Sequence, residues 1–441
     1  MGVVKDQIDK IRIPFLRALI RPVYLLLVRF YVYVRKFGEI RIIKATHKRH
    51  ALLQQNYKQR KQKQVKVLFL VLNASIWKYD ILFKKMLADD SFEPLLFICP
   101  LKQLSSEDQL DEIDRIYAQF AQRGFPIQRP FNEYGELIDI KNEFQPDFVF
   151  FTNPHELSHD IYSITNFNNS LSAYAPYSIM ATNKPLLQYD KLFHNLLWRL
   201  YNETPIHQQM AKKYARVKGS NATVAGSSIL EALNHSKTNK TAWQNSGNQK
   251  KIIYAPHHTF NDLEELNFST IIENGWFMLE MAKKYEQQIH IAFKPHPLLK
   301  TKLYKYPLWG KEKTDAFYSE WDTLSNTQIE LGDYIDLFQQ SDAMILDSIS
   351  FITEYLFVDK PSLFLFNKEI NFKAFNTYGK ASLACLEWAN SHHEIEGFIQ
   401  CVIREVDKLQ NKRNQFLQQN YPKNQLTFSD FVIRDIKQVF N

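Results

Sequence analysis

Glycine and cysteine are both scarce in this 441-residue chain. It contains 12 glycines, too few for a glycine-rich loop to be the basis of a phosphate site. The three cysteines, Cys99, Cys385 and Cys401, lie in apolar stretches without the spacing of metal ligands. Such a small, odd number argues against a disulfide framework and favours a reducing compartment.

Acidic residues are scarce at the start of the chain. Residues 1–63 contain 16 Lys/Arg but 3 Asp/Glu, a balance of +13, whereas the whole chain carries +8. The remaining residues are therefore mildly acidic, with a balance of −5. A basic terminal arm suits an anionic membrane or a nucleic acid. Because the acidic body has no recognised binding motif, we expect no nucleic-acid partner.

Long apolar runs are missing from this basic segment. Its longest run without a charge, Pro22–Val28, is too short for a membrane-spanning helix, and the interrupting arginines do not fit a secretory signal. Five basic side chains fall within about 120° of one helical face: Arg17, Arg21, Arg29, Arg35 and Lys36. Residues 1–64 therefore predict an amphipathic helix that lies on anionic lipids, with the protein peripheral at the cytoplasmic face of a bacterial inner membrane. The alternative is a helix that packs on the protein's own body.

The body alternates between strand and helix patterns. The apolar run at 65–72 is nearly continuous, as in a strand buried on both faces of a parallel sheet. Further strands are predicted at 95–99, 147–152, 251–256, 289–294, 342–347 and 362–366. Helices are predicted at 78–88, 107–123, 268–285, 334–340 and 350–358.

This rhythm predicts an α/β protein with two consecutive doubly wound, Rossmann-like domains. We place the first domain at 65–220, the second at 221–385, and C-terminal helices at 386–441. In such a fold, ligands bind in the central cleft, outside the carboxyl ends of the strands.

One motif in the second domain combines a strand, a turn and a helix: SDAMILDSISFITEYLF, Ser341–Phe357. A helix N-terminus offers unpaired N–H groups and partial positive charge to a phosphate. Ser348 and Ser350 add hydroxyl donors, and Asp347 lies beside them in the turn. Glu354, one turn further on, is placed to accept hydrogen bonds from ribose hydroxyls. The alternatives are a serine that caps the helix and a glutamate that is a surface charge.

Two further motifs place histidines directly after strands: YAPHHTF at Tyr254–Phe260 and FKPHP at Phe293–Pro297. Prolines on both sides hold His296 in an extended turn, where it is placed to donate to a phosphate oxygen or to protonate a leaving group. We include Lys294 among the donor-binding candidates. Because His257 and His258 are adjacent, we expect one of them, His257, to face the cleft. The alternative for each histidine is a structural role.

These three motifs, with KPSLFLF after them, resemble the C-terminal domain of the CDP-glycerol glycerophosphotransferase family, over roughly residues 250–370. The resemblance implies a GT-B fold, peripheral membrane attachment, and transfer of glycerol phosphate or ribitol phosphate from a CDP-alditol. NPH at Asn153–His155 and YAPYS at Tyr174–Ser178 resemble first-domain motifs of shorter members. The sequence departs from the family in lacking a WHGTP-type motif, whose histidine is the proposed base. His155 is our candidate replacement.

The resemblance implies a transferase that acts on a lipid-linked or polymeric cell-surface glycan, without a cofactor. No DxD-type metal motif is evident, so we expect no metal. Three alternatives remain open at this point: a sugar transferase of the same fold, a UDP-sugar 2-epimerase, and a non-catalytic GT-B scaffold.

Overall fold

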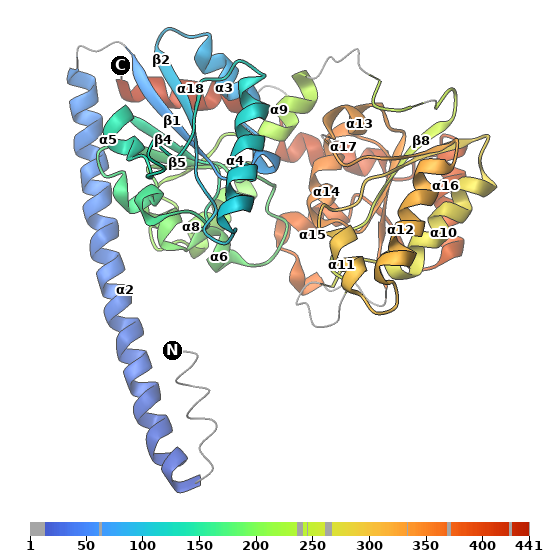
Figure 1. The fold of residues 1–441 in the computed structure, drawn as a ribbon, viewed down its shortest axis with the longest axis horizontal. Helices are drawn as coiled ribbons and strands as arrows, with labels where there is room; N and C mark the ends of the chain where they lie inside the picture. The colour runs from blue at the N-terminus through green and yellow to red at the C-terminus, as the bar shows by residue number, and fades with distance from the viewer. Residues whose placement is uncertain are drawn as a thin grey trace.

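A computed structural model of the protein contains two α/β domains and a long N-terminal helix, α2, Pro14–Gln59 (Figure 1). The described residues are 14–60, 64–235, 241–244, 246–260, 267–332, 334–367, 372–422 and 426–440. Side chains are described from residue 36 onward, except at Ser75.

The first domain is built on seven parallel strands in the order β3-β2-β1-β4-β5-β6-β7. They are β1 Val65–Val71, β2 Phe92–Ile98, β3 Ile127–Gln128, β4 Phe148–Phe151, β5 Leu171–Tyr174, β6 Arg199–Asn202 and β7 Ala222–Val224. Side chains of β1 alternate between two cores, with Val67 and Phe69 in one and Leu68 and Leu70 in the other. This burial on both faces confirms the prediction made from the apolar run.

Helices flank this sheet (Figure 1). They are α3 Asp80–Leu87, α4 Ser106–Ala121, α5 Ile140–Phe144, α6 Pro185–Tyr189, α7 Leu192–Leu196 and α8 Pro205–Tyr214, with the 3-10 turns η1 Ala74–Ile76, η2 Asp160–Tyr162 and η3 Ile164–Asn166. The next helix, α9 Ser228–His235, lies between the domains and buries Ile229 and Leu233 in the core of the second domain. Helix α4 begins where the Ser105 hydroxyl accepts the Asp108 N–H at 3.2 Å, and it buries Ile113, Ile116 and Phe120 at helical spacing.

The second domain has six parallel strands in the order β10-β9-β8-β11-β12-β13. They are β8 Lys250–Ala255, β9 Ile289–Phe293, β10 Thr327–Ile329, β11 Ala343–Leu346, β12 Ser362–Leu365 and β13 Glu387–Ala389. The strand order reverses between β8 and β11. This reversal is the switch point at which open α/β sheets bind ligands.

The remaining helices include one that returns to the first domain. They are α10 Ile271–Lys284, α11 Leu299–Lys305, α12 Gly310–Thr323, α13 Ile335–Gln340, α14 Ile349–Glu354, α15 Thr377–Leu383, α16 His392–Ile403, α17 Gln410–Asn420 and α18 Phe428–Phe440, with η4 Tyr355–Val358 and η5 Phe372–Ala374. The segment 386–441 thus also contains strand β13. Helix α18 buries Phe428, Val432 and Ile436 in the core of the first domain, and Asp435 pairs with Arg199 at 2.9 Å.

The two domains meet closely beside α15. Asn376 donates its backbone N–H to the carbonyl of Ala181 at 2.9 Å, and Thr182 forms a β-bridge with Phe375. A methyl group added to Gly379 would lie 2.3 Å from the Ala181 oxygen. Only glycine fits this approach without displacing backbone.

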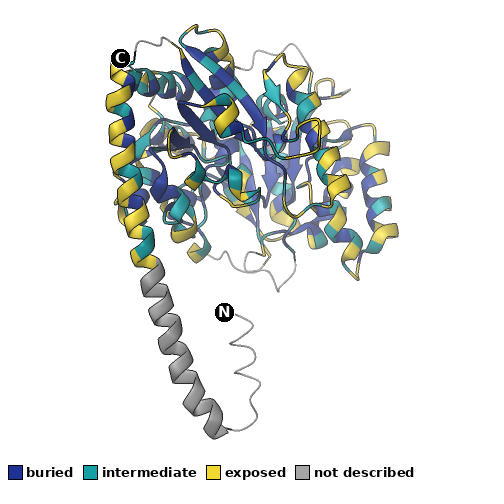
Figure 2. Cartoon of the chain, turned by 60° about the vertical axis from the view of Figure 1, so that its left-hand side comes forward, coloured by how far each residue is buried: buried dark blue, intermediate teal, exposed yellow. Residues whose placement is uncertain are grey.

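The C-terminal part of α2 packs on the first domain, whereas its outer side is exposed (Figure 2). Ile43, Leu53 and Tyr57 are buried against the body, and Phe37 and Leu52 are exposed. This part matches the alternative of a helix packed on its own body. The arc from Arg17 to Arg35 lies outside the residues whose side chains are described, so its membrane role remains a prediction. In the described part of the chain, no helix is sufficiently long and apolar to cross a bilayer.

Candidate functional site

Asp347 lies at the switch point, directly after β11, and is completely buried. It accepts hydrogen bonds from the backbone N–H of His257 and from the backbone N–H and hydroxyl of Thr270, the last two at 2.6 and 2.9 Å. Burial raises the pKa of Asp347 to about 7, and these three bonds oppose the rise. Because all three bonds go to protein groups, Asp347 fixes the turn after β8 that carries His257.

Three imidazoles meet where β8 and β9 end, and we call His257, His258 and His296 the histidine cluster. The ring centroids lie 4.4 Å apart for His257–His258, 5.2 Å for His257–His296 and 4.1 Å for His258–His296. One nitrogen of each ring lies within 4.8 Å of the others. The structure therefore brings together the two predicted histidines and adds His258, whose ring was not expected on the same side.

Two histidines of the cluster, His257 and His296, are held neutral at physiological pH. Burial is the main cause, and together with the neighbouring rings and Lys302 it lowers the pKa of His257 to about 3 and that of His296 to about 4. The Leu298 N–H donates to His296 Nδ1 at 3.1 Å, so the proton of this neutral ring is on Nε2.

This protonation state decides which ligand the cluster suits. A metal ligand must present an unprotonated nitrogen, whereas in His296 one nitrogen is bonded to the backbone and the other carries the proton. The cluster has the three imidazoles that a metal site requires. The hydrogen bonding of His296, however, favours donation from its Nε2–H to an anionic oxygen, beside the positive charge of Lys302.

Both predicted serines lie at the start of α14. Ser348 is the N-cap residue and is 8% exposed, but its side chain makes no capping hydrogen bond. Ser350 is exposed in the first turn. The helix has 6 residues and continues as the 3-10 turn η4. A side-chain cap, the alternative role of Ser348, is thus absent among the described contacts.

Glu354 connects the two domains. It is 3% exposed and accepts a hydrogen bond from the Tyr334 hydroxyl. Lys78, which follows β1 of the first domain, lies 3.0 Å from that hydroxyl and 4.6 Å from the centre of the Tyr334 ring. Burial raises the pKa of Glu354, while Lys78 and Tyr334 oppose the rise. Glu354 is therefore a buried interdomain contact and not a surface charge.

The other two candidates lie apart from each other. Lys294 is buried after β9 and donates to the carbonyl of Gly332 at 2.7 Å. His155 is exposed after β4 in the first domain, where its Nδ1 lies 2.7 Å from Lys191 Nζ. Burial and Lys191 lower the pKa of His155. Its described contacts are within the first domain, so the structure does not bring it to the histidine cluster.

A second polar group lies at the carboxyl edge of the first sheet. Glu203 follows β6 and is 5% exposed, and neither carboxyl oxygen has a hydrogen-bond partner among the described residues. Burial raises its pKa to about 8. Its Oε2 lies 3.7 Å from Nδ1 of His207, whose ring packs on Tyr378 of the second domain with centroids 4.7 Å apart. Glu203 thus lies at the domain junction as a neutral acid.

The sequence did not single out Lys78, Tyr334, Lys302, His258 or Glu203. Lys78 and Tyr334 are 256 positions apart, and no local pattern links them. Lys302 had a weak signal, because it follows the FKPHP motif on the next helix, α11.

Comparison with known proteins identifies the fold. No protein-family model and no curated protein matches the sequence. Among solved structures, MnaA of S. aureus in a co-structure with UDP has a TM-score of 0.54 and 13% identity, covering 85% of this chain and 96% of that chain. UDP-GlcNAc 2-epimerase from Neisseria meningitidis, bound to UDP-GlcNAc, has a TM-score of 0.54 and 14% identity, covering 85% and 100%.

A structure of the wall teichoic acid polymerase TagF has a TM-score of 0.53 and 12% identity, and covers 91% of this chain and 98% of that chain. At such low identities the likeness shows the fold alone. Two parallel sheets with flanking helices, arranged as in these proteins, confirm the predicted α/β class and its GT-B-like architecture.

Proposed function

We propose that the protein is a transferase that moves glycerol phosphate, or another alditol phosphate, from a CDP-activated donor to a hydroxyl of a lipid-linked or polymeric cell-surface glycan. The histidine cluster carries this proposal. It lies at the switch point, where this fold binds ligands, and His296 offers a neutral N–H donor beside Lys302. The wall teichoic acid polymerase TagF has the same fold.

The donor lies along the carboxyl ends of β8, β9 and β11 in this proposal. His257, His296 and Lys302 bind its diphosphate, with Ser348 and Ser350 at the other side. Asp347 positions the turn of His257. Neutral donors and one lysine stabilise charge at the phosphates, so the proposal includes no metal or cofactor.

Two candidate residues need a change of partner on donor binding. Glu354 exchanges the Tyr334 hydroxyl for ribose hydroxyls, and Lys294 exchanges the Gly332 carbonyl for a phosphate oxygen. The first exchange occurs beside Lys78, which reaches the Tyr334 hydroxyl from the first domain.

The reaction is a displacement at the β-phosphorus. The acceptor oxygen forms a bond to this phosphorus, the bond to the bridging oxygen breaks, and CMP leaves with the electron pair. His155 accepts the acceptor's proton, and this step requires the first domain to move toward the histidine cluster when substrates bind. Its lowered pKa keeps its imidazole neutral. His296 donates to the phosphate oxygens as charge develops.

The basic N-terminal segment holds the protein on anionic lipids at the cytoplasmic face of the membrane. Its exposed described residues include Lys36, Arg41, Lys44 and Lys48. A membrane surface places the cleft near a lipid-linked acceptor.

A second candidate is transfer of a sugar from a nucleotide sugar. It is favoured by the two solved structures of this fold that contain UDP or UDP-GlcNAc. The same site then binds the diphosphate, and the whole nucleoside diphosphate leaves instead of CMP.

A donor panel tests the proposal. The protein is incubated with CDP-glycerol, CDP-ribitol or UDP-sugars and a lipid-linked glycan, and the products are weighed by mass spectrometry. We expect CMP release and an acceptor heavier by one alditol phosphate. His296→Gln should abolish turnover, whereas the exposed control His393→Gln should not. Release of UDP with a glycosylated acceptor would establish the second candidate, and no transfer from any donor would overturn both.

A further inference from the structure

A hollow of about 170 Å³ lies between α2 and the first domain. Hydrogen bonds fix the helix on either side of it: His47 Nε2 lies 2.8 Å from the carbonyl of Asn195, and the Tyr57 hydroxyl donates to the carbonyl of Asn169 at 3.2 Å. The hollow is beside the residues that precede β5, at the amino-terminal end of that strand. It is therefore on the side of the first sheet away from the carboxyl edge and from the histidine cluster.

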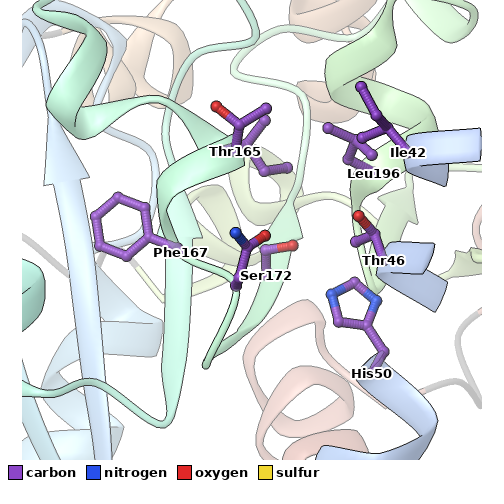
Figure 3. A pocket seen from close by; sticks show the side chains of 9 residues that line it. Ile42, Thr46, His50, Thr165, Phe167, Ser172 and Leu196 are labelled. Atoms are coloured by element: carbon purple, nitrogen blue, oxygen red, sulfur yellow. The ribbon is translucent and has the colours of Figure 1, made fainter. Parts of the chain in front are cut away.

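The lining is mixed in polarity and uncharged. It consists of Ile42, Thr46, His50, Ile164, Thr165, Phe167, Asn168, Ser172 and Leu196. The His50 ring points into the hollow (Figure 3). His50 is 6% exposed, and its Nδ1 has no hydrogen-bond partner among the described residues. Burial and His47 lower the pKa of His50 to about 4, so the ring is neutral at physiological pH.

Two apolar side chains of the lining lie apart from His50. Ile42 and Leu196 lie together on one side, and His50 lies further along α2 (Figure 3). Ile42 is 46% exposed, so the lining reaches the surface on this side. A cavity of about 150 Å³ holds a benzene-sized molecule. The hollow thus suits a group of similar size that is polar at one end and continues as an apolar chain at the other.

We propose that this hollow binds the hydroxylated end of a neutral lipid-like amphiphile, with a hydroxyl on His50 Nδ1 and the aliphatic chain leaving past Ile42 to the surface. A hydroxyl both donates and accepts, so it satisfies His50 in either tautomer. A charged end is excluded, because none of the nine lining side chains carries a charge to offset its desolvation.

Calorimetric titration of the full-length protein with monomeric 1-octanoylglycerol tests the ligand class. We expect saturable binding at one site, and binding at least about tenfold weaker for octanoate, whose carboxylate loses its hydration without gaining a partner. Glycerol should also bind at least about tenfold more weakly, because it lacks the chain that contacts Ile42. Equal binding of glycerol, or no saturable binding of 1-octanoylglycerol, overturns the proposal.

Variants test the site itself. His50→Leu should weaken binding of 1-octanoylglycerol about tenfold by removing the polar partner, and His50→Gln should retain most of it. Lys48→Ala, at an exposed position of the same helix, is the matched control and should bind as the unaltered protein does. In the unaltered protein the ring signals of His50, followed by NMR with labelled histidine, should shift on saturation. Unchanged affinity in His50→Leu, or unshifted His50 signals, places the amphiphile elsewhere and refutes the site.

Discussion

Replacing Glu203 with glutamine should stabilise the protein at alkaline pH and have little effect at acidic pH. The carboxyl group of Glu203 is buried at the domain junction without a hydrogen-bond partner among the described residues, and burial raises its pKa from 4.5 to about 8. Between these two values the folded protein keeps a proton that the unfolded chain has lost. Stability therefore falls as pH rises through this range. Glutamine has no carboxyl proton to lose, so the stability of the Glu203→Gln variant does not decrease in this way.

The magnitude follows from the two pKa values. At about 1.4 kcal/mol for each tenfold change in proton affinity, the contribution of Glu203 to the free energy of unfolding falls by about 4–5 kcal/mol between pH 4.5 and pH 8. His207 does not offset this, because burial lowers its pKa to about 4 and leaves it neutral. The tyrosines near Glu203 are Tyr79, Tyr174, Tyr189, Tyr378 and Tyr421, and burial raises the pKa of each.

Urea unfolding at several pH values measures this difference. Glu203→Gln should match the unaltered protein at about pH 5 and exceed it by roughly 2–5 kcal/mol at about pH 8. Glu280→Gln, the same chemical change at an exposed position, should alter stability at neither pH. If the stability difference between Glu203→Gln and the unaltered protein is the same at both pH values, Glu203 does not bind a proton as argued.

Three further predictions concern the junction and the N-terminal segment. Gly379→Ala should lower the free energy of unfolding by about 1–3 kcal/mol, since the added methyl group would meet a backbone oxygen 2.3 Å away. The control Gly397→Ala, whose methyl group would enter open space in helix α16, should raise the melting temperature. Equal melting temperatures of the two variants would contradict this prediction. Lys78→Met should destabilise more at about pH 8 than at about pH 5, because Glu354 loses a cation that lowers its pKa, and a pH-independent loss would refute that coupling. Removal of residues 1–35 should release the protein from anionic vesicles in sedimentation, and continued binding would disprove the proposed anchor.

The central strands of both sheets were predictable from sequence because parallel strands are buried on both faces, whereas β3, β5, β6, β10 and β13 were not predicted. Val65–Val71 and Phe148–Phe151 are almost entirely apolar, and each forms a strand as predicted. Helices with buried residues at helical spacing, such as α4 and α10, were predicted to within a few residues. The return of α18 to the first domain was not predictable, because the pattern of an amphipathic helix does not indicate which domain its apolar side packs against.

The histidine cluster was partly predictable. Prolines and strand ends located His257 and His296, because a strand that ends beside a proline exposes the next side chain at the edge of the sheet. The structural role of Asp347 could not be predicted from the sequence. From sequence it was a candidate ligand, and only the fold shows that the start of α10 supplies two of its partners. The Lys78–Tyr334–Glu354 contact arises from the way the domains meet, which no local pattern records.

The path of the last helix has a consequence for how the chain matures. The core beneath β1 includes side chains of α18, among them Phe428, Val432 and Ile436. The first domain thus lacks a wall of its interior until residues 428–440 have been synthesised. The second domain, whose strands and helices are contiguous from β8 to α17, has all its parts sooner. All described helices and strands of the second domain are therefore synthesised before the helix that completes the core of the first.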